Sequence, residues 1–326
     1  MSDWIVPDFS AHWAVDIAKE YGVSLVYFSA FSAASSAFFG PMENLTGANR
    51  NYALPSPQSL TTPPEWISFP SMVAFKEYEA IYVPRGFFGA NSTGISGASR
   101  LAKIISASKA LAIRTCNEIE GDYLELYKKI TGKPVIPTSV LPPEEPGKRV
   151  EREMSSDGFM FDWLDKQNPR SVLFLGFGSE CKLSKEQVHE IAYGLELSEL
   201  PFLWALRKPN SANNAYEVDD FLPLGFVDRT SEKGLVCFGW VPQMEILGHP
   251  SWRRSGLAVE VKHNEVGSLS RDEIAKTLRR AMVEEEGEQL RTNARKAAVV
   301  FGDHKLHQDH YIGAFVDYLK NNGAKR

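Results

Sequence analysis

A glycine-rich turn in the second half of the chain offers chemistry suited to a phosphate. The apolar run 171–175 leads into Gly176-Phe177-Gly178-Ser179, and a helical pattern begins shortly afterwards. Such a turn presents free backbone N–H groups and a hydroxyl to an anion. The alternative is that the glycines only turn the chain between a strand and a helix. The position of the turn in a second α/β segment favours diphosphate binding.

A second candidate site is Gly239-Trp240-Val241-Pro242-Gln243, which follows the apolar run 235–238. A tryptophan at a strand end can lie flat against a nucleobase while backbone amides read the edge of the base, and Gln243 can bond a ribose or a base. The alternative places Trp240 in the core and Gln243 in the first turn of a helix. From these residues alone, the core interpretation is favoured.

Asp8 is the candidate catalytic carboxylate. It follows an apolar strand and precedes a helical pattern, which places it at the carboxyl end of a strand, where open α/β sheets carry their active sites. It can orient a histidine base or cap the helix, and the two roles are compatible. His12 lies only four residues later on the first turn of that helix, and we interpret it as structural.

A histidine cluster near the end of the chain raises the question of a metal ion. Its i, i+3 and i+6 spacing places the imidazoles only partly on one helix face, so we predict no metal site. The cluster consists of His304, His307 and His310, with Asp303 and Asp309.

Alternating strand and helix patterns position these residues in two α/β domains with parallel sheets. In the first half we predict strands at 4–6, 23–28, 110–115 and 135–137, helices at 10–21 and 118–129, and loops with short helices over 30–100. In the second half we predict strands at 171–175, 202–206 and 235–238 and helices at 185–197, 243–247, 270–285, 288–301 and 306–320. Ser270 and Glu273 form a predicted capping box.

The expected domains are an acceptor-side domain over 1–140, an exposed linker over 141–154 and a second domain over 155–326. The linker is rich in proline and charge and has no apolar periodicity. The last helix is a candidate to pack back on the first domain. Because the strand at Trp4 to Val6 needs neighbouring strands to cover it, we expect the chain to begin inside a domain.

Composition excludes several classes of function. The 326 residues are 43% hydrophobic with a net charge of −5, so the chain can bury a core and offers no basic field for nucleic acid. Cys116, Cys181 and Cys237 are odd in number and widely spaced, which is typical of thiols in a reducing compartment. With no signal peptide or spanning segment found, we expect a cytoplasmic protein, most simply a monomer.

Several segments together resemble the plant family-1 UDP-glycosyltransferases, in particular the branch that adds a sugar to glycosides of flavonoids, terpenoids or steroids. The matching segments occur in family order over nearly the whole chain. They are Asp3-Trp-Ile-Val-Pro-Asp8-Phe, Phe161-Asp-Trp-Leu-Asp165, Gly176-Phe-Gly-Ser-Glu180, Phe202-Leu-Trp-Ala-Leu-Arg207 and Trp240-Val-Pro-Gln-Met-Glu-Ile-Leu-Gly-His-Pro-Ser251.

The resemblance implies a GT-B fold of two Rossmann-like domains and inverting transfer of a sugar from a UDP-sugar to a hydroxyl of a small secondary metabolite or its glycoside. Trp240 would then stack on uracil, and Val241 would bond the base through its backbone. Ser179, beside Gly178, would approach the diphosphate. Asp8 would pair with the histidine base. The UDP-sugar is a co-substrate, and no cofactor is expected.

The sequence departs from the family pattern in two places. After Ser251 the His-Cys-Gly-Trp-Asn-Ser-like turn and the later ribose- and sugar-binding residues are missing, and Ser255-Gly256-Leu257 resembles a point well beyond them. The family's first strand and base histidine find no match before Met1. We therefore expect both domains to be incomplete and turnover to be very low or absent. An alternative is an inactive isoform or fragment that binds a nucleotide or a partner weakly; an oxidoreductase is disfavoured because no complete Gly-x-Gly-x-x-Gly occurs.

Overall fold

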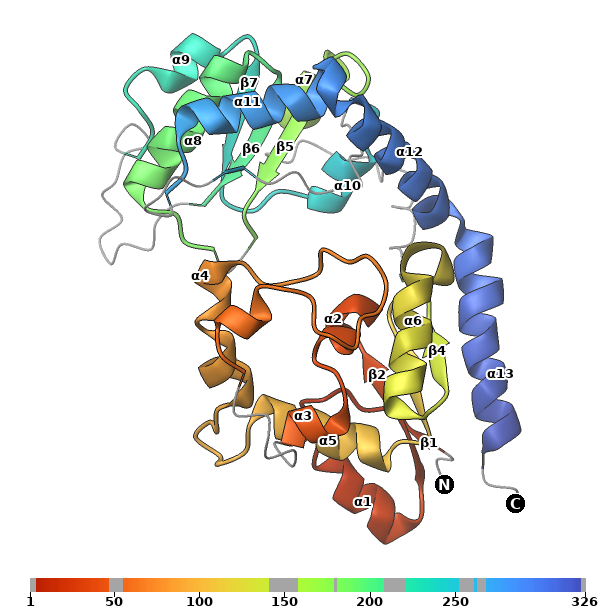
Figure 1. The fold of residues 1–326 in the computed structure, drawn as a ribbon. Helices are drawn as coiled ribbons and strands as arrows, with labels where there is room; N and C mark the ends of the chain where they lie inside the picture. The colour runs from red at the N-terminus through yellow and green to blue at the C-terminus, as the bar shows by residue number, and fades with distance from the viewer. Residues whose placement is uncertain are drawn as a thin grey trace. The chain divides into compact units, whose positions relative to one another are not determined.

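The computed structural model describes residues 4–46, 55–140, 158–178, 181–207, 221–251, 261–262 and 268–323 (Figure 1). The chain divides into two compact units, one of residues 1–143 with 300–326 and the other of residues 144–299. The predicted linker 141–154 lies outside the described residues. Within the described ranges, every helix is too short or too polar to span a bilayer.

The first unit is built on a parallel sheet of four strands in the order β1-β2-β3-β4. The strands are β1 (Trp4–Ile5), β2 (Ser24–Ser29), β3 (Ala110–Ile113) and β4 (Val135–Pro137). All four residues of β3 are buried, as expected for a parallel strand that is covered on both faces.

The two faces of this sheet are covered by helices from distant parts of the chain. Because strand residues alternate in direction, Leu111 and Ile113 join one core cluster, and Ala110 and Ala112 join another. Helices α2, α5 and α6 contribute to the first cluster. The second cluster is covered by α13, through Phe315, Tyr318 and Leu319. The Trp4 indole N–H also donates to the Leu319 carbonyl at 2.9 Å.

The helices of the first unit include several short ones between β2 and β3. They are α1 (Ala14–Tyr21), α2 (Ala33–Phe38), α3 (Met42–Thr46), η1 (Gln58–Leu60), α4 (Glu77–Ala80), η2 (Pro84–Phe88), α5 (Gly97–Ala107), α6 (Asn117–Thr131), η5 (Leu306–Ile312) and α13 (Gly313–Asn322). Tyr311 ties η5 to α6, because its hydroxyl donates to Glu118 Oε2 at 2.6 Å and accepts the Asn117 N–H at 2.9 Å.

The second unit contains a parallel sheet in the order β5-β6-β7. The strands are β5 (Leu173–Gly176), β6 (Phe202–Leu206) and β7 (Gly234–Phe238). The helices are α7 (Gly158–Asp165), α8 (Lys185–Ser198), α9 (Phe226–Thr230), α10 (Gln243–Gly248), α11 (Arg271–Met282), η4 (Glu285–Gly287) and α12 (Glu288–Gly302), of which residues 300–302 are counted with the first unit. Phe202, Trp204 and Leu206 pack against α8 and α11, whereas Leu203 packs against α7 and α10.

The observed elements differ from the predicted ones mainly at their ends and in three helices that were not predicted, α5, α7 and α9. Helix α1 begins at Ala14 rather than near Ser10, because residues 10–13 form turns. Helix α5 was not predicted; Ser96 caps it by accepting the Ser99 N–H at 3.0 Å. Ser270 caps α11 by accepting the Glu273 N–H at 3.4 Å, which is the hydroxyl half of the predicted box.

In the histidine cluster near the chain end, His307 is buried, whereas His304 and His310 are exposed. His307 is fully buried, and one ring nitrogen, Nε2, lies 2.8 Å from the Val300 carbonyl oxygen. Among the residues that the structure describes, no group of three or more His, Cys, Asp or Glu side chains could hold a metal ion.

Gly194 controls how closely α8 and α11 pack, which gives a stability prediction. A Cβ at this position would lie 2.6 Å from Ile274 Cγ2 and 3.1 Å from the Arg271 carbonyl oxygen. We expect Gly194→Ala to destabilise the unit by about 1–3 kcal/mol, because the steric clash outweighs the gain in helix propensity. Gly121→Ala in α6 is the control, since nothing lies within 4 Å of its Cβ. Thermal unfolding measures both; equal shifts would contradict the packing argument.

Tyr311 gives a second stability prediction. Tyr311→Phe removes both hydrogen bonds of this hydroxyl. A neutral hydrogen bond typically contributes about 0.5–1.5 kcal/mol to stability, and one to a charged group about 1.5–3 kcal/mol. We expect the melting temperature to fall by several degrees. Tyr318→Phe is the matched control, because it keeps the tilted packing of this ring against Trp4, with ring centroids 6.2 Å apart. A Tyr318→Phe variant that loses as much stability would indicate a general effect of hydroxyl removal.

Candidate nucleotide-binding site

A pocket of about 1110 Å³ lies at the carboxyl ends of the three strands of the second unit. Each strand contributes the residues that follow it, because the ends of parallel strands meet at one edge of a sheet. The lining consists of Gly176 to Gly178 and Cys181 to Leu183 after β5, Ala205 to Arg207 from β6, Phe221, and Phe238 to Val241 with Gln243 after β7. The predicted Gly178, Trp240, Val241 and Gln243 are thus brought together.

Trp240 and Val241 are neighbours with opposite environments. The indole of Trp240 is 80% exposed and lines the pocket, whereas Val241 is 5% exposed and belongs to the core cluster with α7. The interpretation of Trp240 as a core residue is therefore wrong. Gly239, with φ of +100°, provides the turn that directs Trp240 outward, since this conformation is costly for residues with a Cβ. An exposed indole beside a pocket suits stacking on a planar base.

Gln243 begins α10 and points toward the glycine turn. Its Nε2 lies 3.6 Å from the position that a Cβ on Gly176 would occupy, so the glycine leaves room for the amide at the mouth of the pocket. Gly178, with φ of +69°, forms the turn after β5. Ser179 lies outside the described residues. The amide can both donate and accept hydrogen bonds, which suits a ribose hydroxyl or a base edge.

Two cationic side chains line the pocket, and the sequence analysis did not select either of them as a site residue. Lys182 follows the glycine turn and Arg207 follows β6, whereas none of the described lining residues is acidic. Arg207 directly follows an apolar strand in the sequence, and this position could have identified it as a site residue. Both cationic side chains can donate charge-assisted hydrogen bonds to an anionic group such as a diphosphate.

Asp8 lies after β1 in the first unit and is engaged by its own neighbours. Its Oδ1 accepts the Ser10 hydroxyl at 2.5 Å, the Ser10 N–H at 2.8 Å and the Ala11 N–H at 3.2 Å. The Ser10 hydroxyl, together with the two N–H groups, holds the pKa of Asp8 below its usual value. His12 Nδ1 instead lies 3.3 Å from the Ser10 carbonyl oxygen. In the described residues Asp8 thus acts as a turn-capping carboxylate.

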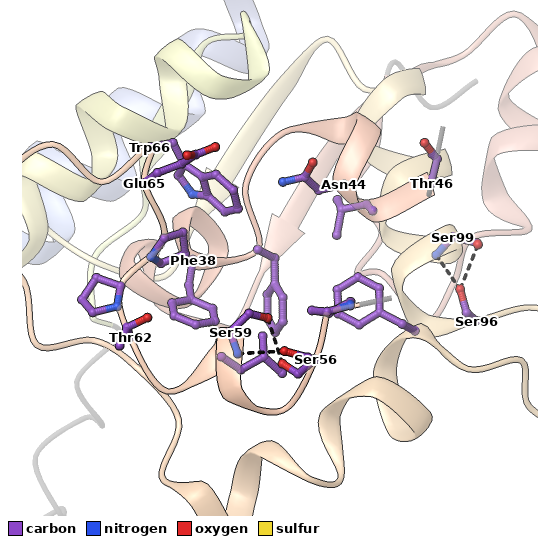
Figure 2. Close-up of a pocket in the computed structure, with 17 residues that line it drawn as sticks. Phe38, Asn44, Thr46, Ser56, Ser59, Thr62, Glu65, Trp66, Ser96 and Ser99 are labelled. Atoms are coloured by element: carbon purple, nitrogen blue, oxygen red, sulfur yellow. Dashed lines mark hydrogen bonds between the residues drawn. The ribbon is translucent and has the colours of Figure 1, made fainter. Parts of the chain in front are cut away.

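The first unit has a pocket of its own, of about 580 Å³, shown in Figure 2. Aromatic rings of Phe38, Phe39, Trp66 and Phe88 form much of its wall. Polar side chains share the lining: Asn44, Thr46, Ser56, Ser59, Thr62, Glu65, Ser96 and Ser99. The Trp66 indole N–H donates to the Ala37 carbonyl at 2.8 Å, which fixes the ring in the wall. The pocket suits a ligand with flat apolar rings and several hydroxyls.

Curated plant proteins are similar to this chain over nearly its whole length. The soyasaponin III rhamnosyltransferase of Glycine max is 34% identical over an alignment that covers 98% of this chain and 73% of the relative. UDP-glycosyltransferase 91D2 of Stevia rebaudiana is 32% identical, with 98% and 74% covered. No family model matches the sequence.

Solved structures show the same fold. A UDP-glycosyltransferase from Siraitia grosvenorii in complex with UDP has a TM-score of 0.70 at 22% identity and covers 98% of this chain and 82% of that one. Phytolacca americana UGT2, solved with UDP-2-fluoro-glucose and pterostilbene, also has a TM-score of 0.70, at 20% identity, with 98% and 75% covered. The fold is the GT-B fold with two Rossmann-like domains. On its sequence relatives and its fold, this chain belongs to the plant UDP-glycosyltransferases, an enzyme family.

Proposed function

We propose that the chain binds a UDP-sugar in the pocket at the carboxyl ends of β5, β6 and β7 and descends from enzymes that transfer the sugar to a plant secondary metabolite. The observation that carries the proposal is the exposed Trp240 indole beside a pocket with Lys182 and Arg207 and no described acidic residue. Uracil would stack on Trp240, and the Val241 backbone would bond the base. The diphosphate would approach the turn at Gly178 and Ser179.

The aromatic pocket of the first unit is the proposed acceptor site. Its rings would pack against an apolar aglycone, and its hydroxyls would bond sugar or phenol groups. One relative is named for soyasaponin, and one neighbour was solved with pterostilbene. Both names support an acceptor that combines apolar rings with hydroxyls, such as a terpenoid, steroid or flavonoid glycoside.

In the proposed reaction, the acceptor oxygen forms a bond to the anomeric carbon while the bond to the UDP oxygen breaks, with inversion. The acceptor proton passes to a base, and Lys182, Arg207 and backbone N–H groups would stabilise the charge that develops on UDP. Asp8 would support a histidine base in this family. Its carboxylate oxygen Oδ1 instead accepts three bonds from Ser10 and Ala11, which favours a capping role.

We further propose that this chain lacks an internal part of the donor site and turns over very slowly. The alignment with the soyasaponin rhamnosyltransferase has 361 positions but covers about 319 residues of this chain. Roughly 40 residues of the relative therefore have no counterpart in this chain within the aligned region. The break in the family pattern after Ser251 supports placing such a gap there. Loss of a preorganised contact to the leaving group typically lowers the rate by about 10²–10³-fold. The alternative function is therefore weak nucleotide binding without transfer.

We infer a cytoplasmic location from the three cysteines, because they are odd in number and widely spaced. Cys116 and Cys237 are buried, and Cys181 is exposed. Burial raises the pKa of the Cys116 thiol to about 11, so this cysteine stays protonated and unreactive at neutral pH.

Calorimetric titration of UDP tests the donor site. We expect measurable binding by the 326-residue chain and a loss of about fivefold or more in affinity for Trp240→Ala, because base–aromatic stacking contributes about 1–3 kcal/mol. Trp13→Ala is the matched control, since Trp13 is exposed in the first unit and lies outside both pockets. Unchanged affinity in Trp240→Ala, or equal loss in Trp13→Ala, would show that the pocket does not hold the base as proposed.

UDP release tests the proposed low turnover. With UDP-glucose or UDP-rhamnose and a panel of flavonoid and triterpenoid glycosides, we expect release at least about a hundredfold slower than that of the soyasaponin rhamnosyltransferase assayed in parallel. A rate within tenfold of that relative would refute the proposal. Sequencing the transcript across the Ser251–Ser255 junction tells whether a longer form also exists.

A further inference from the structure

His249 lies at the centre of a hydrogen-bonded group that connects three elements of the second unit. Its Nε2 lies 2.9 Å from Asp165 Oδ1 at the end of α7, and its Nδ1 lies 2.7 Å from Ser251 Oγ. The Ser251 backbone nitrogen also lies 3.2 Å from the same Nδ1. His249 itself caps the carboxyl end of α10.

The geometry fixes the tautomer of His249. A backbone N–H can only donate, so the contact from Ser251 requires Nδ1 to be an acceptor without a proton. The ring proton then lies on Nε2 and is donated to the Asp165 carboxylate. The Ser251 hydroxyl donates to Nδ1 as well. Every polar atom of the imidazole is therefore used within this group.

The group contains a serine, a histidine and a carboxylate, yet it does not suit a hydrolase. Ser251 is 2% exposed, so its hydroxyl has no access to a substrate carbonyl. Asp165 bonds Nε2 and Ser251 bonds Nδ1, which is the reverse of a Ser-His-Asp triad, and Nδ1 is shared with a backbone amide. The arrangement is that of an anchor, because each bond fixes a segment of chain to another.

The anchored segment joins α10 to the edge of the sheet. The Pro250 and Ser251 carbonyls accept the N–H groups of Arg170 and Val172, each at 3.0 Å, alongside the start of β5. Helix α10 has six residues, and its other end carries Gln243 and follows Trp240. Ile246 is 1% exposed and packs against α7, but apolar packing is non-directional and leaves the rotation of a short helix poorly defined.

We propose that His249, held by Asp165 and Ser251, is a positioning residue that orients α10 and so sets where Trp240 and Gln243 meet the uridine. The inference rests on the proposed UDP site. The hydrogen bonds of His249 fix the carboxyl end of α10. The buried side chain of Val241 fixes the chain at the amino end of the helix. A helix of about 9 Å transmits a displacement at one end directly to the other.

Four variants separate the two sides of the His249 group, the hydrogen bond from Nε2 to Asp165 and the hydrogen bonds from Ser251 to Nδ1. His249→Ala removes both sides. His249→Asn keeps an acceptor near the position of Nδ1, and His249→Gln keeps a donor near the position of Nε2. Asp165→Asn weakens only the bond to α7. Asp162→Asn, at an exposed position on the same helix, is the matched control.

Three measurements test the proposal. Side-chain nitrogen NMR of the wild type is expected to show a proton on Nε2 of His249. Hydrogen exchange of the amides from Gly239 to Ile246 is expected to be faster in His249→Ala than in Asp162→Asn. The UDP dissociation constant is expected to rise about fivefold or more in His249→Ala, with partial recovery in His249→Asn.

The outcomes distinguish this inference from the proposed function. A proton on Nδ1, or exchange and affinity in both His249→Ala and His249→Asn equal to those of the control, would overturn the positioning role. If the wild type does not bind UDP, the proposed function fails, and faster exchange near Trp240 in His249→Ala still decides whether His249 orients α10. A general loss of stability would instead raise exchange equally in β6 and α8.

Discussion

Parallel strand pairing is the constraint on which both units depend. Parallel strands need crossover connections, and α8, which connects β5 to β6, is one that also covers a face of the sheet. In the second unit, α8 and α11 cover one face of β6 and α7 and α10 cover the other. The same pairing brings the carboxyl ends of β5, β6 and β7 to one edge. The chemistry of the pocket follows from the residues after each strand, which are glycines after β5, Arg207 after β6 and Trp240 after β7.

The donor site combines a buried chain segment with one exposed side chain, that of Trp240. Val241 and Ile246 hold the chain around Trp240 in a core cluster, while the indole itself stays in solvent. The chain next to the ring is fixed in the core before a ligand arrives, so less conformational freedom is lost when a nucleobase stacks on the indole.

Much of the fold could be predicted from local patterns, and the remainder depended on distant contacts. Strand β6 coincides with its predicted range, and Ser270 caps α11 as its side chain and position suggested. Helix α5 was missed because Ser96 to Ser99 is typical of a loop until the cap is seen. The exposure of Trp240 could not be read from its own sequence, since an apolar ring after a strand suits a core equally well. The pairing of Asp165 with His249 joins residues 84 positions apart and has no local signal.

The covering of the first sheet by α13 has a consequence for how the protein is made. Val26, Ala110 and Ala112 face Phe315, Tyr318 and Leu319, yet about 175 residues separate β4 from α13. At about 5–20 residues per second, translation leaves this apolar face uncovered for roughly 10 to 35 seconds. The second unit, whose residues 144–299 are continuous, can complete its core during that interval. The nascent first unit is thus the part whose apolar surface stays open to aggregation for the longest time.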